Sequence, residues 1–197
     1  MGRRWTFRKL KINVMKNLLF VIIFLSSIFS IVNAQEKFIT KSGEINFEAS
    51  VPSFEEVKAT HNSVSAIIKS NGEFASLALV KGFRFKVALM EEHFNENYAE
   101  SSTYPKATFK GKVKDFDISE LSTDHKEYVV SGTVNMHGVD KKIETKALIR
   151  KVGDNLFLDT QFVLKPEDFN IEIPSVVSSK IAEEIHVSAS FEFKGTS

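Results

Sequence analysis

The sequence contains no cysteine, so disulfide bonds, thiolate chemistry and lipid-modified cysteine are all excluded. Proline and glycine are also scarce, with four and nine copies in 197 residues, and there is no low-complexity linker or repeat of solenoid period. Phenylalanine is abundant, with 18 copies. We therefore expect one ordered domain that is held together by packing alone.

The sequence also lacks the common motifs of enzymes and metal sites. It has no G-x-S-x-G elbow, no glycine loop for phosphate and no H-E-x-x-H pair among its five histidines. His93 stands near Glu92 and Glu96, a combination that could hold a divalent ion but is common on solvated helix faces. We interpret this cluster as an acidic surface. The sequence thus predicts a protein that is not an enzyme, with no catalytic residues, no metal and no cofactor.

The N-terminus has the pattern of a secretory signal. The apolar run from Leu18 to Phe29 is shorter than the roughly 20 residues that a spanning helix needs. Basic residues precede it, and Val32-Asn33-Ala34 places small residues where a signal peptidase reads them. We expect residues 1–34 to be a signal peptide removed after Ala34, with Met15 as a possible true start and an uncleaved anchor as the alternative. The domain at 35–197 would then be periplasmic or extracellular, and the sequence does not separate these two locations.

Removal of residues 1–34 changes the charge balance. Six of the 26 lysines and arginines leave with the signal, so 20 basic residues face 25 acidic ones and the net charge becomes −5. Because nucleic-acid binding depends on clustered basic residues, we expect no nucleic-acid partner. The remaining chain has no long apolar run, so we expect no stable insertion into a membrane.

Period-two alternation dominates the rest of the chain. In the segment 44–49, Ile45 and Phe47 alternate with Glu44 and Asn46, as they do in a strand with one dry face. Asn71-Gly72 is a favourable turn for a two-residue hairpin. Alternation and turns predict strands over 44–49, 63–70, 73–85, 112–116, 128–136, 142–150, 156–164 and 185–193. Such a meander is typical of an antiparallel sandwich or a closed barrel.

Helical spacing replaces the alternation over residues 85–100. There we expect a capping helix whose Met90, Phe94 and Tyr98 face inward and whose Glu91 and Glu92 form an outer, solvated face. Residues 175–184 and 54–59 are shorter helix candidates.

The inward positions of the strands carry large aliphatic and phenyl groups. An eight-stranded barrel with such an interior has either a filled core or room for one small ligand, and spacing alone leaves both possibilities open. The residues predicted to line a cavity are Phe83, Phe85, Phe94, Tyr98, Phe109, Val130, Met136, Ile149, Leu158, Phe162 and Phe191.

His137 stands at a strand end, directly before Gly138. We interpret it as a structural residue that satisfies the backbone of a turn, with a polar handle for a ligand headgroup as the alternative.

Several motifs together resemble the YceI-like family of secreted isoprenoid-binding proteins. They are His93-Phe94, Tyr104-Pro105 followed by Phe109, Gly132, His137-Gly138-Val139 and Asp168-Phe169-Asn170-Ile171. The most specific part is Tyr104-Pro105-x-x-x-Phe109 combined with the His137-Gly138-Val139 turn. The resemblance covers about residues 38–193. It implies a lipocalin-like antiparallel barrel of eight strands, with helices at the ends and a long isoprenoid chain in its lumen.

The chain departs from the family pattern in two places. Family members often have His-Ser in the first strand, where this chain has Thr40-Lys41-Ser42-Gly43-Glu44, and Arg-Asp where it has Glu91-Glu92. We expect both departures to lie at the barrel mouth or its lid. The headgroup preference of other members therefore does not transfer to this chain.

The resemblance and the apolar inward face together predict a non-catalytic binder or carrier of a lipophilic molecule, such as a quinone or a polyprenyl lipid. The alternative is a filled barrel that serves as a structural or interaction module of the cell envelope. The identity of the ligand, the direction of transfer, protein partners and the oligomeric state stay open.

Overall fold

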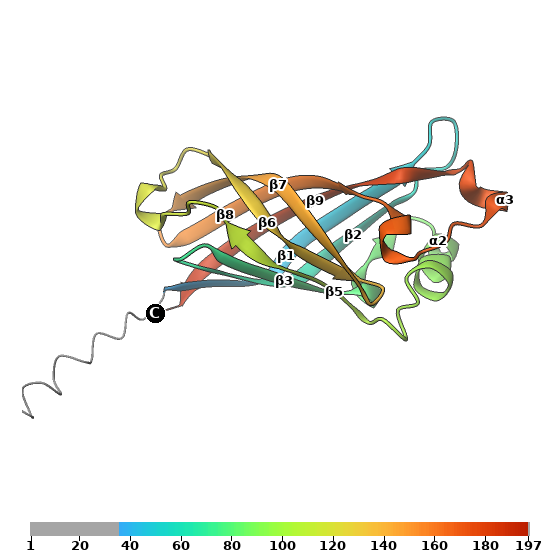
Figure 1. The fold of residues 1–197 in the computed structure, drawn as a ribbon, viewed down its shortest axis with the longest axis horizontal. Coiled ribbons are helices and arrows are strands. Elements are labelled where there is room, and N and C mark those ends of the chain that lie inside the picture. The colour runs from blue at the N-terminus through green and yellow to red at the C-terminus, as the bar shows by residue number, and fades with distance from the viewer. Residues whose placement is uncertain (1–35, 197) are drawn as a thin grey trace, which may run out of the picture. The chain divides into compact units, whose positions relative to one another are not determined.

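In the computed structural model, which describes residues 36–196, nine strands form one antiparallel sheet (Figure 1). Strand β1 pairs with β9 on one side and with β2 on the other, so eight strands close into a barrel, while the two-residue β4 is added at β2. This confirms the expected antiparallel barrel of about eight strands. The strands are β1 (Lys37–Ser50), β2 (Lys58–Lys69), β3 (Glu73–Leu79), β4 (Arg84–Phe85), β5 (Lys106–Val113), β6 (Lys126–Met136), β7 (Val139–Val152), β8 (Asn155–Leu164) and β9 (Ile181–Thr196).

The helical elements are short. They are the 3-10 turns η2 (Val80–Gly82), η4 (Ile118–Glu120) and η5 (Pro166–Phe169), the α-helices α2 (Ala88–His93) and α3 (Ser175–Ser178), and the π-helix η3 (Phe94–Tyr98). Between residues 36 and 196, no helix combines the length and the apolar composition needed to cross a membrane. The proposed signal at 1–34 lies outside the described residues.

Several boundaries differ from expectation because strand pairing overrides local pattern. The strand expected over 73–85 ends at Leu79, and after η2 only Arg84–Phe85 forms a further short strand, which pairs with β2. The helix expected over 175–184 ends at Ser178, since Ile181 already pairs with Ser50 in β1. Residues 54–59 form no helix, and Lys58 begins β2. The strand expected at 112–116 runs earlier, as β5, because its partners β3 and β6 hold residues 106–113.

The two ends of the barrel differ in construction. At one end, which we call the mouth end, α2, η3, η5 and α3 gather beyond the strand termini (Figure 1). The opposite end, the packed end, carries tight turns and the connection 114–125. The first and last strand residues also meet there, with Lys37 paired to Thr196. The mouth end therefore has the longer connecting segments, 80–105 and 165–180.

Large apolar side chains are buried in the packed half of the barrel. Phe38 and Phe193 are at most 1% exposed, and the Phe116 and Tyr128 rings, 5.6 Å apart between centroids, lie where the long connection covers that end. Burying a side chain of this size contributes about 1.5–3 kcal/mol, so this half contributes strongly to stability.

A bulge in β1 belongs to this packed half. The pairing of β1 shifts register between Thr40 and Gly43, and Thr40 itself is 6% exposed opposite Ala66. Gly43 is required because a Cβ there would lie 2.4 Å from Cδ1 of Phe191. The expectation that this segment lies at the mouth is therefore wrong, since Thr40 stands three residues from the packed end.

Candidate functional site

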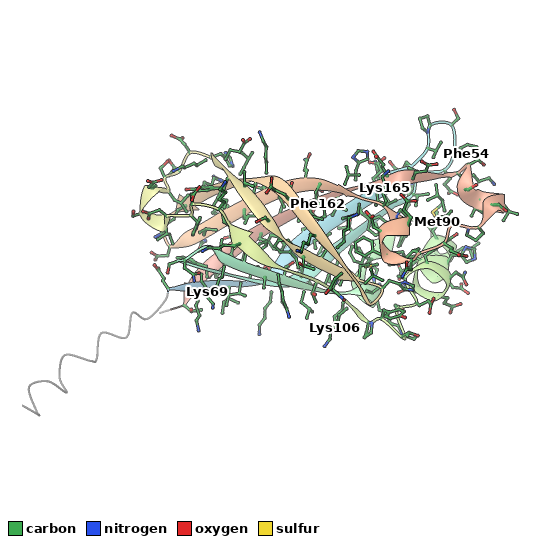
Figure 2. All side chains as sticks on the ribbon, in the orientation of Figure 1. Phe54, Lys69, Met90, Lys106, Phe162 and Lys165 are labelled. Atoms are coloured by element: carbon green, nitrogen blue, oxygen red, sulfur yellow. The ribbon has the colours of Figure 1, made fainter. Side chains whose placement is uncertain are left out.

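The mouth half of the barrel contains a cavity of about 510 Å³. Its wall combines inward side chains of the strands with residues of α2, η3, η5 and α3, and Phe54, Met90, Phe162 and Lys165 mark its extent in Figure 2. The wall is almost entirely aliphatic and aromatic. This volume falls within the range of small-molecule sites in proteins, about 300–1,000 Å³.

The structure brings together nine of the eleven residues that the sequence suggested for the lining. These are Phe83, Phe85, Phe94, Tyr98, Phe109, Val130, Met136, Phe162 and Phe191. Ile149 and Leu158 lie elsewhere, fully buried in the packed half and paired with each other across β7 and β8. The reason is that alternation specifies which face of a strand points inward but not how far along the barrel a residue lies.

Three phenyl rings form the floor of the cavity. The Phe74 centroid lies 5.4 Å from that of Phe109 and 5.6 Å from that of Phe191. Gly111 and Gly132 face each other across β5 and β6, and a Cβ on either would lie 2.6 Å from Cζ of Phe109. The two glycines therefore create the space into which the Phe109 ring extends.

A second group of rings joins the cap to the barrel wall. Phe47 of β1, Phe83, Phe85 of β4 and Phe94 of η3 have five pairwise centroid distances between 5.2 and 5.9 Å. Such tilted and edge-to-face pairs contribute about 0.5–1.5 kcal/mol each beyond their buried area. Phe47 was not among the residues predicted to line the cavity, although the alternation of Ile45 and Phe47 with Glu44 and Asn46 placed it on the dry face.

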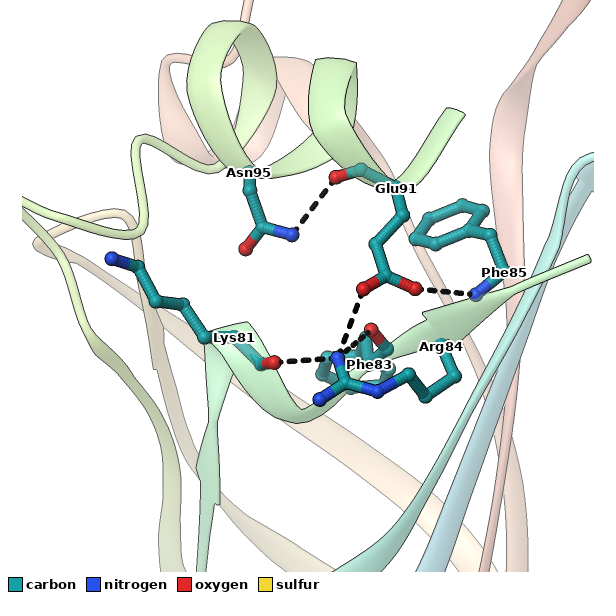
Figure 3. Close-up of polar contacts among 6 residues, drawn as sticks. All are labelled: Lys81, Phe83, Arg84, Phe85, Glu91 and Asn95. Carbon is teal, nitrogen blue, oxygen red and sulfur yellow. Dashed lines mark hydrogen bonds and ion pairs between the residues drawn. The ribbon is translucent and has the colours of Figure 1, made fainter. Parts of the chain in front are cut away.

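A carboxylate fastens the same cap (Figure 3). The Phe85 backbone N–H donates to Oε2 of Glu91 at 3.1 Å, and Nη1 of Arg84 donates to Oε1 at 3.0 Å. Nδ2 of Asn95 donates to the Glu91 carbonyl oxygen at 2.8 Å. We call the contacts of the Glu91 carboxylate with Arg84 and Phe85 the Glu91 latch.

The expectation that both glutamates form a solvated outer face is therefore wrong for Glu91. Its side chain is 28% exposed, whereas Glu92 lies on the exposed surface and makes no side-chain hydrogen bond within residues 36–196. Strand β4 has only two residues, so its Phe85 N–H needs a partner, and the carboxylate provides it.

His137 is held by protein groups on both sides of its ring. Nδ1 donates to the Phe169 carbonyl oxygen at 3.0 Å, and Nε2 faces Oε1 of Glu100 at 3.3 Å. The ring centroid lies 4.4 Å from that of Tyr104, and a Cβ on Gly138 (φ +74°) would lie 2.7 Å from Cε1 of Tyr104.

These contacts show that His137 has a structural role. His137 does not line the cavity, and its Nδ1 fixes η5 against the β6–β7 turn, so that the buried Phe169 lines the cavity wall instead. Both ring nitrogens face protein acceptors, which leaves none for a ligand headgroup.

Two hydroxyl groups of the inner wall bond the barrel backbone. Oγ1 of Thr145 donates to the Gln161 carbonyl oxygen at 2.7 Å, and Oγ1 of Thr160 donates to the Lys146 carbonyl oxygen at 2.8 Å. These hydroxyls are therefore satisfied by the barrel itself. Charged side chains lie only at the rim, where Glu55, His93, Lys165 and Lys180 contribute to the lining.

Across the described residues 36–196, no three histidine, aspartate and glutamate side chains are grouped so that they could hold a metal ion. The cluster around His93 thus has no third ligand. Its neighbour Glu91 is bound to Arg84 and the Phe85 backbone.

Eight antiparallel strands closed around an apolar cavity, with short helices over one end, define a lipocalin-like barrel with an interior site. The chain belongs to the YceI-like domain family, whose sequence profile matches residues 26–193. No curated protein sequence matches it.

Solved structures share this fold at low sequence identity. A polyisoprenoid-binding domain from Saccharophagus degradans, implicated in plant cell wall breakdown, is 17% identical, with a TM-score of 0.70 over 81% of this chain and 98% of that one. BcnA from Burkholderia cenocepacia is 15% identical, with a TM-score of 0.64 over 77% and 95%. A YCEI protein from Campylobacter jejuni is 16% identical, with a TM-score of 0.58 over 75% and 89%.

Proposed function

We propose that this protein binds a lipophilic, isoprenoid molecule, such as a quinone or a polyprenyl lipid, in the lumen of its barrel. The observation that carries the proposal is the apolar cavity of about 510 Å³. Each buried CH₂ of a ligand contributes about 0.8 kcal/mol, so such a wall holds a prenyl chain without directional contacts. The likeness to a structure described as a polyisoprenoid-binding domain supports the proposal.

The same site argues for binding without catalysis. The wall hydroxyls of Thr145 and Thr160 already bond the barrel backbone, and the charged residues stand only at the rim. The cavity also disfavours the alternative of a filled structural barrel. We therefore propose a non-catalytic carrier or binder.

Organic extraction of the protein, purified from its native host without detergent, tests the proposal. We expect mass spectrometry to detect a prenyl lipid or quinone that co-purifies with the wild type. The double variant Phe94→Ala with Tyr98→Ala should retain much less of it, because both side chains cover the cavity from η3. His125→Ala, an exposed change in the connection 114–125, is the matched control and should retain the wild-type amount. Absence of any lipid, together with no binding of added quinone or polyprenol, would reject the function.

We also propose secretion to the periplasm or the cell exterior, on the basis of the signal-like segment at 1–34. The mass and N-terminal sequence of the native protein test this proposal. A start at Gln35 is expected, and a retained segment 1–34 would contradict it.

A further inference from the structure

The cavity occupies only half of the barrel, and this limits what it can hold. Below the floor of Phe74, Phe109 and Phe191, the interior is closed by fully buried side chains that include Leu156 and Phe193. A linear ligand that enters at the mouth end therefore reaches the three floor rings and extends no further.

The volume converts to a chain length. At about 30 Å³ for each small non-hydrogen group, which is the share of one water molecule in the liquid, 510 Å³ holds on the order of 17 such groups. With five carbons in each isoprene unit, that capacity corresponds to roughly three to four units. A longer chain leaves its remaining units outside the cavity.

Phe109 differs from the other two floor residues. The Phe74 and Phe191 rings both pack against Phe193 and so belong to the core as well, with centroid distances of 6.2 and 5.7 Å. The Phe109 ring lies instead over Gly111 and Gly132, which have no side chains of their own. Loss of the Phe109 ring would therefore open space that nothing else fills, continuous with the cavity.

We propose that this cavity selects a short prenyl chain of about four isoprene units, and that Phe109 determines the limit. The inference rests on the proposed function and adds a ligand length and a specificity-determining residue to it. Val134, paired with Phe109 across β5 and β6 and also in the wall, is the position from which the floor can be raised.

A length series of prenyl alcohols tests the proposal. Farnesol, geranylgeraniol and solanesol, with three, four and nine isoprene units, would compete with a fluorescent apolar dye for the purified full chain. From three to four units the Kd should fall by about tenfold or more, because added carbons are buried. From four to nine units it should change by less than about threefold, because added carbons stay outside. A Kd that continues to fall steeply up to solanesol would overturn the proposal.

Two variants should change, in opposite directions, the longest prenyl chain that the cavity can bury. Phe109→Ala should extend it by about one isoprene unit, and Val134→Phe should shorten it by about as much, so farnesol should bind this variant as tightly as geranylgeraniol. Leu156→Ala, a cavity-creating change below the floor, controls for lost stability and should leave the limit unchanged.

The outcomes separate the two proposals. If the limit stays at four units in both floor variants while prenyl alcohols still bind, the length proposal fails and the proposed function stands. If none of the alcohols displaces the dye from the wild type, both proposals fail.

Discussion

His61 is a buried titratable residue that the binding site does not use. It is 4% exposed on β2, and its Nδ1 accepts a hydrogen bond from the Ser63 N–H at 3.1 Å. The neutral ring therefore carries its proton on Nε2, which has no hydrogen-bond partner among residues 36–196. Gly82 lies against this nitrogen so closely that a Cβ there would be 2.1 Å away. Burial lowers the pKa of His61 from its ordinary 6.5, and the positive charge of Arg84 lowers it further.

The sign of this shift predicts how stability depends on pH. At pH values well above 6.5 the ring is neutral in both the folded and the unfolded state, so its contribution to the free energy of unfolding is fully present. As the pH falls below 6.5, the unfolded chain binds the proton first, and the free energy of unfolding decreases by at most about 1.4 kcal/mol per pH unit. His61→Asn, whose Oδ1 can accept the Ser63 N–H, should lose this part of the pH dependence.

Urea unfolding at about pH 7.5 and at about pH 5.5 measures the effect. His125→Asn is the control, because His125 is exposed and should keep the wild-type difference between the two pH values. If His61→Asn also kept that difference, burial of His61 would not be its source.

The cap of α2 and η3 depends on the Glu91 latch as well as on its aromatic contacts. Glu91→Gln keeps one acceptor but removes the charge, so the bonds to Arg84 and to the Phe85 N–H weaken by about 1 kcal/mol. We expect the cap to open more often and a bound prenyl chain to dissociate about fivefold faster. Stopped-flow dissociation of a fluorescent prenyl probe measures this rate.

The neighbouring residue provides a matched control for the latch. Glu92→Gln makes the same chemical change at an exposed position with no side-chain bond in the described part of the chain. Its dissociation rate should stay within the error of the wild type. Equal rates for the two variants would show that the latch does not hold the cap.

Most elements were predictable from the sequence, and the exceptions have physical causes. The strands follow from alternation, which depends on each residue and its near neighbours. The latch did not follow, because it requires a two-residue strand whose Phe85 N–H donates to a side chain of the following helix. A run such as Met90-Glu91-Glu92-His93 predicts a solvated helix face. Only the position of the Phe85 backbone in the structure shows that Glu91 has a partner.

At the scale of the whole molecule, the two halves of the barrel differ in role. The packed half contains the buried core, and the mouth half contains the cavity. Leu158 and Phe162 both point inward from β8, two periods of the alternation apart, yet Leu158 is packed and Phe162 lines the cavity. Sequence predicted the inward face for both. It could not separate them, because height in the barrel depends on register between strands, such as the pairing of Leu158 with Phe191.

This division predicts that a substitution in one half mainly changes stability and a substitution in the other mainly changes ligand affinity. Leu158→Ala should lower the free energy of unfolding by about 2–5 kcal/mol, because it leaves a cavity in a filled region, while the affinity for geranylgeraniol stays near that of the wild type. Phe162→Ala should cost less stability, since its ring already borders open space, but should weaken binding about tenfold. Guanidinium unfolding and dye competition on the same samples measure both. A variant pair that changed stability and affinity in parallel would contradict the division.

The pairing of Lys37 with Thr196 has a practical consequence. Both ends of the barrel chain lie at the packed end, away from the cavity mouth. A surface linker attached after residue 196 would therefore hold the barrel with its opening towards the solution (Figure 1). An oriented layer of this kind would let hydrophobic analytes enter from the bulk phase, which makes the barrel a natural starting point for an immobilised sensor.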